Sequence, residues 1–173
     1  ADTMVGDATS AMDAAEVLPD MATADICGAD AITNFLSAAG DPENGTYSVA
    51  GEYSRRNDFE GSCGGAGNDR AYAFIAPQSG LWVFTIESEE DGLDSVLHAR
   101  SDCADSGTEL GCNDDSAPGQ TLLSQLRITM TAEQNIYLFV DAYGGAGAPF
   151  VLTARQIPLV ALGEACDPEN ELN

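Results

Sequence analysis

The stretch that decides the fold runs from Asp94 to Gly147. It reads D94-SVLHARSDCADSGTELGCND-D115 and then, after a short turn segment, T121-LLSQLRITMTAEQNIYLFVDAYGGA-G147. It contains three runs of β-forming residues bordered by carboxylates: Asp94–Arg100, Leu122–Thr129 and Asn135–Val140. Strands that deliver carboxylates to a shared end predict a β-sandwich with an oxygen-lined cation site, and calcium is the cation that such ligands favour.

The same alternation continues on both sides of this stretch. Further strands are expected at Tyr47–Tyr53, Ala71–Ala76, Leu81–Glu87 and Pro149–Gln156. The pair Ala71–Ala76 and Leu81–Glu87, joined by a turn at Pro77–Gly80, is predicted to form a hairpin that supplies core aromatics. Strands at intervals of roughly ten to fifteen residues with turns between them are typical of a sandwich. The predicted fold class is therefore an all-β, antiparallel β-sandwich of the jelly-roll kind.

Three parts of the chain are expected to differ in role. Residues 46–157 form the sandwich, residues 1–45 are an extended N-terminal tail and assembly segment, and residues 158–173 supply a C-terminal strand and an acidic tail. Residues 32–39 in the N-terminal part fit either a short helix or a first edge strand. Residues 1–26 contain no aromatic and no basic residue, so they cannot bury enough surface to fold alone. We expect this segment to be ordered when it adds a strand to a neighbouring copy.

Charge is the extreme feature of the composition. The chain has 29 acidic and 6 basic residues, a net charge of −23, and every basic residue is arginine. Such a field repels nucleic acid and anionic membranes, and it attracts divalent cations. Because the sequence has no apolar run of about 18 residues, no membrane span is predicted. The chain starts at Ala1, and we expect a mature secreted protein whose signal peptide has been removed.

Five cysteines in a lysine-free acidic chain indicate an oxidising, extracellular compartment. We predict that Cys103 pairs with Cys112 across a hairpin or loop, and that Cys27 pairs with Cys63. Cys166 is then left over for an intermolecular bond or a reactive thiol. The number of cysteines equally allows Cys166 to pair with Cys27 or Cys63. Without a CxxC pair or a His/Cys cluster, zinc is not expected.

The order of several motifs resembles the bacterial pre-peptidase C-terminal (PPC-like) domain family. The motifs that carry the resemblance are GSCGGAGNDRAYAFIAPQSGLWVFTIES, LDSVLHARSDC, TELGCNDDS and IYLFVDAYGGAGAPFVLTA, within residues 46–156. The resemblance implies a secreted β-sandwich module of a kind that is appended to extracellular enzymes and surface proteins. Several modules of this family bind calcium. This sequence departs from that pattern in having a tail of more than forty residues, and no catalytic domain, before the module.

The candidate ligands of a calcium ion are Asp94 at the start of a predicted strand, Asp141 at the end of another, and a loop after Cys112 that contains Asn113, Asp114 and Asp115. The alternative interpretation is that these residues only terminate strands and form Asx turns. His98 is the single histidine, and its place within a strand indicates a packed residue rather than a catalytic base. No serine lies in a G-x-S-x-G elbow, so no enzyme activity is predicted.

We therefore expect a non-enzymatic, secreted structural subunit, stabilised by Ca²⁺, that assembles into a homopolymeric extracellular filament through its N-terminal tail. The alternative is an extracellular binding module that contacts glycan, protein or cell surface through exposed aromatics. The aromatics available for such a surface are the same ones that the strand spacing assigns to the core, namely Tyr72, Phe74, Trp82, Phe84, Tyr137 and Phe139.

Overall fold

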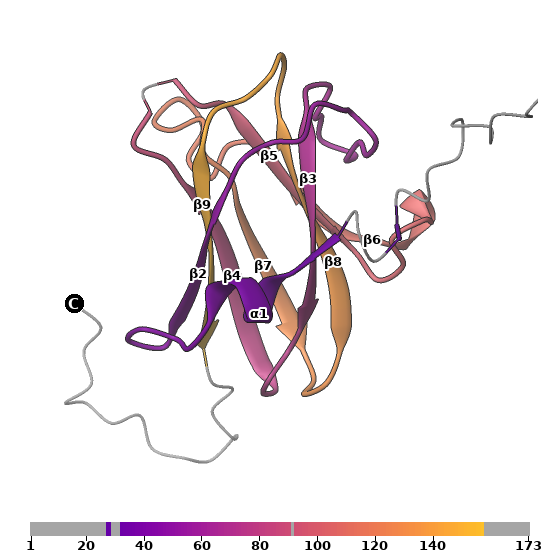
Figure 1. Cartoon of the computed structure of the whole chain (residues 1–173), viewed down its shortest axis with the longest axis vertical. Coiled ribbons are helices and arrows are strands. Elements are labelled where there is room, and N and C mark those ends of the chain that lie inside the picture. The colour runs from indigo at the N-terminus through magenta and orange to yellow at the C-terminus, as the bar shows by residue number, and fades with distance from the viewer. Residues whose placement is uncertain (1–26, 29–31, 91, 158–173) are drawn as a thin grey trace, which may run out of the picture.

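Two facing β-sheets make up the body of the protein (Figure 1). The structure, a computed structural model, describes residues 27–28, 32–90 and 92–157. One sheet has the strand order β1-β3-β8-β5-β6 and the other has the order β2-β9-β4-β7. The strands are β1 (Ile32–Asn34), β2 (Thr46–Gly51), β3 (Asp69–Ile75), β4 (Gly80–Glu87), β5 (Ser95–Arg100), β6 (Glu109–Asn113), β7 (Gln125–Met130), β8 (Asn135–Ala142) and β9 (Phe150–Ile157), with α1 (Phe35–Ala39) after β1 and the 3-10 helix η2 (Ser106–Thr108) before β6. The predicted all-β sandwich is confirmed.

The core lies between the two sheets and is rich in aromatic residues. Phe74 on β3 contacts Trp82 and Phe84 on β4 edge-on, with ring centroids 4.9 and 5.0 Å apart. Aromatic pairs prefer this T-shaped geometry because the positive ring edge meets the negative face. The alternation seen in the sequence therefore reports which face of each strand points into the core.

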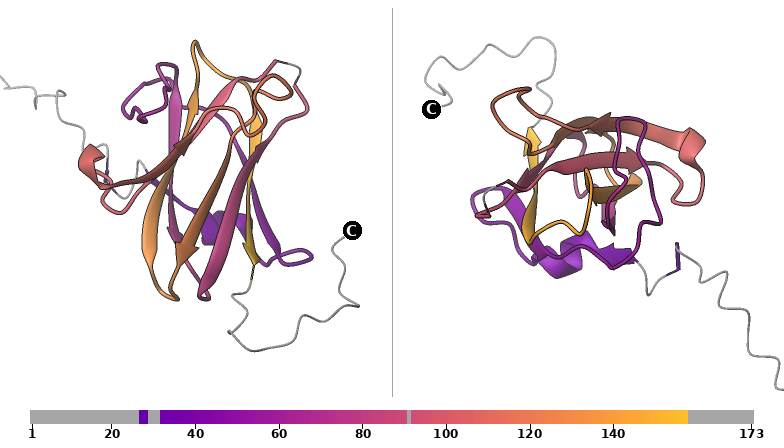
Figure 2. Two further views of the ribbon diagram at one scale, coloured as in Figure 1. Left: turned by 180° about the vertical axis from the view of Figure 1, so that it is seen from behind. Right: turned by 90° about the horizontal axis from the view of Figure 1, so that it is seen from above.

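The predicted hairpin of Ala71–Ala76 with Leu81–Glu87 is wrong. Strand β3 pairs with β1 and β8, whereas β4 pairs with β7 and β9 in the opposite sheet. The turn at residues 76–79 carries the chain from one layer to the other, and the view from above in Figure 2 shows these two layers. Strands β3 and β4 each carry their large aromatic side chains on one face. These side chains become fully buried because the two faces lie opposite each other across the core.

Residues 32–39 form a strand and a helix in succession, so both readings of this segment hold in part. Strand β1 runs parallel to β3, with Ile32 opposite Ala71. The Asn34 side chain then caps α1 by accepting a hydrogen bond from the Ser37 amide at 2.9 Å. Phe35 is fully buried in the core. The sandwich thus begins before residue 46, the predicted boundary. The predictions for residues 1–26 and 158–173 concern parts of the chain outside the described residues.

None of the predicted strands covers β6, which lies where the sequence predicts a hairpin or loop between Cys103 and Cys112. This strand pairs antiparallel with β5, with His98 opposite Cys112. It is an edge strand whose residues are mostly half-buried. Because an edge strand buries little of either face, its sequence lacks the clear alternation that reveals the other strands.

The predicted pairing of the cysteines is wrong, although the same four residues form the two disulfides. Cys27 bonds Cys103, and Cys63 bonds Cys112, with Cα atoms 5.9 and 5.7 Å apart. Cys112 lies within the paired part of the β5–β6 hairpin, whereas Cys103 lies in the loop beyond its last paired residues. Cys103 and Cys112 are therefore not opposite each other in the hairpin. Each forms its disulfide with a cysteine that precedes β3 in the sequence. Cys166 lies outside the described residues.

Candidate metal centre and buried polar network

Three carboxylates converge at one end of the β5–β6 hairpin. Asp94 comes just before β5, and Asp114 and Asp115 come just after β6. Because the hairpin is antiparallel and places Leu97 opposite Asn113, the start of β5 and the end of β6 meet at the same place. Each of the three residues can offer one carboxylate oxygen such that these atoms lie within 4.8 Å of one another. We call this cluster the acidic triad.

The electrostatics of the acidic triad are unfavourable in the absence of a cation. Partial burial, and after it the Asp115 carboxylate, raises the pKa of Asp94. Partial burial also raises the pKa of Asp114, with Asp115 and then Asp94 adding to the effect. The Oδ1 atom of Asp114 is buried without a hydrogen-bond partner in the described part of the chain. A bound cation would neutralise this repulsion and supply that oxygen with a partner.

The loop that presents Asp114 and Asp115 is held by hydrogen bonds from its neighbours. The Asn113 side chain accepts from the Gln125 amide at 2.8 Å and donates to the Asp115 carbonyl at 3.2 Å. The buried Ser124 hydroxyl donates to the Asp114 carbonyl at 2.7 Å. Asn113, predicted as a ligand, thus has both side-chain ends engaged in positioning the loop.

Asp141, the fifth predicted ligand, lies apart from the acidic triad. It closes β8 on the outer side of the five-stranded sheet, where its Oδ2 is 3.0 Å from the Nε2 of His98 on the neighbouring strand β5. Both side chains are completely buried. The structure therefore brings together three of the five predicted ligands and places the other two in supporting or separate positions.

The His98–Asp141 contact does not repay the burial of its two groups. The distance is short, but the atoms are not aligned as a hydrogen bond, and neither side chain has another hydrogen-bond partner within the described residues. Burial, and then the nearby Asp69 carboxylate, raises the pKa of Asp141 to about 9. Burial, and then Arg100, lowers the pKa of His98 to about 4. Both groups are therefore neutral at pH 7.

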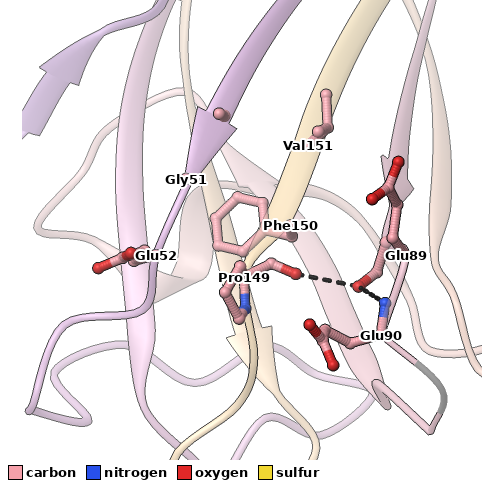
Figure 3. Close-up of a pocket in the computed structure, with 9 residues that line it drawn as sticks. Gly51, Glu52, Glu89, Glu90, Pro149, Phe150 and Val151 are labelled. Atoms are coloured by element: carbon pink, nitrogen blue, oxygen red, sulfur yellow. Dashed lines mark hydrogen bonds between the residues drawn. The ribbon is translucent and has the colours of Figure 1, made fainter.

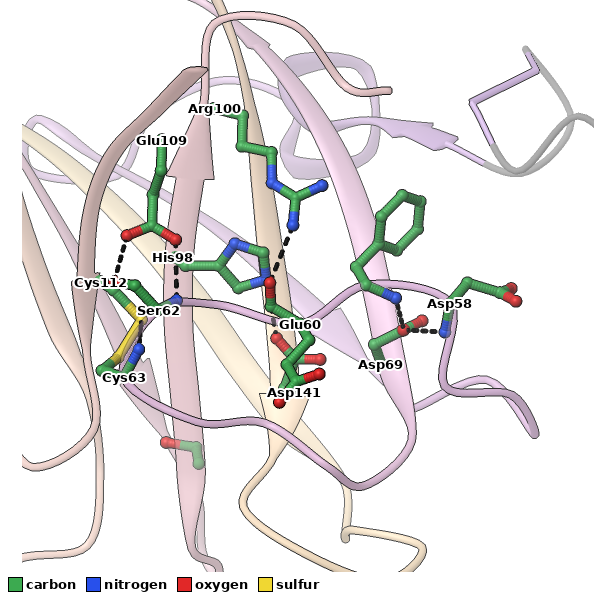
Figure 4. A network of polar contacts seen from close by, with 12 residues as sticks. Asp58, Glu60, Ser62, Cys63, Asp69, His98, Arg100, Glu109, Cys112 and Asp141 are labelled. Atoms are coloured by element: carbon green, nitrogen blue, oxygen red, sulfur yellow. Dashed lines mark hydrogen bonds and ion pairs between the residues drawn. A yellow bond between two sulfur atoms is a disulfide. The ribbon is translucent and has the colours of Figure 1, made fainter. Parts of the chain in front are cut away.

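A glycine-rich segment, residues 58–65, covers this pair (Figure 4). Asp69 holds the start of the segment by accepting from the Asp58 and Phe59 amides at 2.6 and 2.8 Å. Arg100 donates to the Glu60 carbonyl at 2.9 Å. At Gly65, where φ is +99°, an added Cβ would lie 2.9 Å from the Asp141 side chain. The glycine is needed so that the backbone can pass this close.

The far end of the cover is fixed to β6. Cys63 is bonded to Cys112, and the Ser62 amide donates to the Glu109 carboxylate at 2.9 Å. No role was predicted from the sequence for this glycine-rich segment. The signal that could have found it is a histidine and an arginine two residues apart on one face of β5, since polar side chains on a strand face need hydrogen-bond partners, which a covering segment can supply.

A shallow groove of about 490 Å³ opens near the start of β9. Its apolar floor includes Phe150 and Val151, and the carboxylates of Glu52, Glu89 and Glu90 stand around it (Figure 3). The Ser88 hydroxyl donates to the Pro149 carbonyl at 2.9 Å and fixes one wall. This groove adds further negative charge to the end of the molecule that carries the acidic triad.

The described residues thus form a disulfide-bonded β-sandwich with a carboxylate cluster at a loop end. Two disulfides are typical of proteins from the periplasm or the extracellular space. None of the helices in the described ranges has the length and apolar character needed to cross a bilayer.

Comparison with known proteins yields distant likenesses. No protein-family model and no curated protein matches the chain. Among solved structures, it is similar to PliG, a periplasmic inhibitor of g-type lysozyme from Aeromonas hydrophila, at 14% identity over 72% of this chain and 96% of that one, with a TM-score of 0.45. It is also similar to the pre-peptidase C-terminal domain of a collagenase from Bacillus anthracis, at 10% identity over 64% and 87%, with a TM-score of 0.40. Membership of the latter family stays a prediction from the sequence, and the function proposed below rests on neither likeness.

Proposed function

We propose that this protein is a secreted, non-enzymatic structural module whose β-sandwich is stabilised by calcium and whose copies assemble through the N-terminal segment, residues 1–26. The observation that carries the proposal is the convergence of Asp94, Asp114 and Asp115 at one end of the β5–β6 hairpin. The calcium part of the proposal rests on this geometry. The assembly part rests on the free strand edges of the four-stranded sheet.

The acidic triad suits calcium better than other common cations. Calcium takes six to eight oxygens at about 2.3–2.6 Å and tolerates irregular geometry, so three carboxylates, nearby carbonyls and water can complete its shell. The ligands come from two loops that flank paired strands, and a bound ion would tie these loops together. In a chain with a net charge of −23, it would also neutralise the place where three carboxylates meet.

The four-stranded sheet offers edges to which a strand can be added. Within the described residues, β2 and β7 are each hydrogen-bonded to a strand on one side only. Beside the upper half of β2 runs a groove of about 300 Å³, between Val49 and Gly51 on one side and Arg70 and Tyr72 on the other. An unpaired strand edge is a template for main-chain hydrogen bonds from another chain, and an adjoining groove can take alternate side chains. We therefore propose β2 as the acceptor.

Electron microscopy of the natively purified protein, with and without a calcium chelator, tests this function. We expect filaments in calcium that come apart on chelation, and we expect deletion of residues 1–26 to leave soluble sandwiches that do not polymerise. Filaments of the deleted protein would refute the tail mechanism. Filaments indifferent to the chelator would remove calcium from the assembly, and single particles under both conditions would refute the structural role.

One observation favours a binding module as the second candidate. Tyr143 is 51% exposed, and its amide donates to the Asp94 carbonyl at 3.0 Å, so the backbone of an exposed aromatic residue is bonded to a member of the acidic triad. By contrast, Tyr72, Phe74, Trp82 and Phe84 are buried and cannot form a binding platform. Calcium-dependent retention on an insoluble polysaccharide that is lost in Tyr143→Ala would favour this candidate over the structural one.

A further inference from the structure

The two outer faces of the sandwich differ. The outer face of the five-stranded sheet is covered in part by the segment of residues 58–65, which is held down by Arg100, Asp69 and the Cys63–Cys112 disulfide. The outer face of the four-stranded sheet has no such covering segment among the described residues. Trp82, Phe84 and Ile86 of β4 point into the core, so the alternate residues Leu81, Val83, Thr85 and Glu87 lie on this outer face. We call it the open face.

The charges of the open face are sorted by row. Strand register places Arg155 on β9 and Arg127 on β7 on either side of Val83, in one row. The next row on this face, two residues further along β4 than Val83, is uncharged. It consists of three short side chains and one glutamine, namely Ser48, Thr153, Thr85 and Gln125. Two residues further along, Glu87 lies in a row with Val151 and Ala50. The face is positive at one end, neutral in the middle and negative at the other end.

These charges are not neutralised within one copy. Arg127, Arg155 and Glu87 are all exposed. Among the described residues, Arg56 pairs with Asp58, and the His98–Asp141 contact joins two neutral groups. Neither arginine of the open face has a carboxylate partner in this part of the chain. Four residues of a strand separate the Arg row from Glu87, which is roughly 13 Å along the sheet. Arg127 donates to the Gln125 side chain at 3.2 Å, a contact that leaves its charge uncompensated.

We propose that the open face binds the open face of a second copy, with the strands of the two copies antiparallel. The two copies are related by a two-fold axis that lies between the two faces, runs perpendicular to the strands and passes over the Thr85 row. This rotation places residue 83 of β4 in one copy opposite residue 87 of β4 in the other. Glu87 of each copy then lies over Val83 of the other, between Arg127 and Arg155. The same residues meet twice, as an isologous interface requires.

The middle row allows the two faces to approach. Its polar side chains are partly satisfied within the sheet, because Gln125 donates to the Thr85 hydroxyl at 3.2 Å and Thr153 donates to the Thr85 carbonyl at 3.4 Å. Short side chains in the middle row let two sheets pack at about 10 Å. The second copy is thus favoured by shape as well as by charge.

The size of the open face sets the expected affinity. Four strands at about 4.8 Å spacing and seven residues of β4 give roughly 400 Å² per copy, about half of what a standard interface buries on each side. We therefore expect a weak dimer, in rapid exchange with the monomer. This contact uses neither residues 1–26 nor the edge of β2, so it does not depend on the proposed function.

A charge exchange tests the contact. The full chain is studied by sedimentation from about 10 µM to about 1 mM at about 0.15 M salt, which covers the range expected for a contact of this size. Glu87→Arg should raise the dimer dissociation constant at least about tenfold, since each substitution alters two symmetric contacts. Arg127→Glu together with Arg155→Glu should weaken the dimer similarly. Adding Glu87→Arg to these two substitutions should return the constant to within about threefold of the native value, because each pair of facing charges is then opposite again.

Glu87→Arg also separates face pairing from net charge. This substitution makes the net charge less negative by two, from −23 to −21, and so reduces the general repulsion between copies. Glu60→Arg makes the same change on the exposed part of the cover of the opposite sheet and is the matched control. We expect the control to leave dimerisation unchanged or slightly stronger. Equal behaviour of the two variants, or a native chain that is monomeric at every concentration, would overturn the proposal.

The sedimentation pattern distinguishes this contact from tail-mediated assembly. Addition of a tail to a neighbour is heterologous and continues into polymers, whereas an isologous contact stops at two copies. Polymers that persist in Glu87→Arg while the dimer disappears would leave the tail mechanism intact and support the open-face contact. A native chain that forms dimers and no polymers would support the open face and count against the tail.

Discussion

Replacing Asp115 by asparagine should stabilise the calcium-free protein and weaken its response to calcium. Asp115 is the nearest charged influence on both neighbours, since it raises the pKa of Asp94 and of Asp114. Two unit charges 4.8 Å apart repel by about 1 kcal/mol at the dielectric constant of water. Removing the charge of Asp115 relieves two such pairs, or about 2 kcal/mol. Asparagine keeps the size of the side chain, so packing is unchanged.

Thermal unfolding measures both effects. In chelator, about 2 kcal/mol corresponds to a rise in Tm of about 4–8 °C for a chain of this length. In calcium at about a hundred times its Kd, the native protein should gain about 2.7 kcal/mol by mass action. Asp115→Asn loses a carboxylate ligand and should keep less than half of that calcium-induced rise.

Asp41→Asn is the matched control because it removes one exposed carboxylate far along the chain from the acidic triad. It should change neither the calcium-free Tm nor the calcium response by more than about 0.5 kcal/mol. If Asp115→Asn lowers the Tm in chelator and responds to calcium like the native protein, the acidic triad is not a cation site.

Three further predictions follow from the buried network and the core. The folded-state pKa of Asp141 is raised to about 9, so the free energy of unfolding should fall as pH rises from 7 to 9, by up to about 1.4 kcal/mol per pH unit. Denaturant titrations measure this slope, which should be absent in the variant Asp141→Asn. Replacing Cys63 and Cys112 together by alanine should cost about 4 kcal/mol, given their sequence separation of 49, and should raise hydrogen exchange in residues 58–65 while leaving β4 protected. Phe74→Ala should cost about 3–5 kcal/mol in the same titrations because its ring contacts both Trp82 and Phe84, whereas Ile75→Ala at the neighbouring exposed position should cost less than about 1 kcal/mol.

The sequence predicted part of the candidate site for a physical reason. Asp94 stands at the start of a predicted strand, and Asp114 and Asp115 are neighbouring acidic residues in a loop, where oxygen ligands are available. The pairing of β5 with β6, a strand that the sequence did not predict, is what brings this loop to Asp94. Asp141 stands at the end of a strand as well, but its neighbours are His98 and the cover segment. A strand end has two faces and two flanks, and the sequence does not say toward which of them a carboxylate points.

The fold class and most strands were determined by the sequence itself, because alternation of apolar and polar residues is a local property that each strand carries alone. The strong negative charge is likewise a property of composition. Only the tertiary structure decided which sheet each strand joins, which cysteines pair, and that residues 58–65 cover a neutral histidine and carboxyl pair. These features depend on which distant segments come together, and that is set by how the two sheets bury their shared core. The charge rows of the open face exist for the same reason: Arg127, Arg155 and Glu87 come from three strands that become neighbours only in the folded sheet.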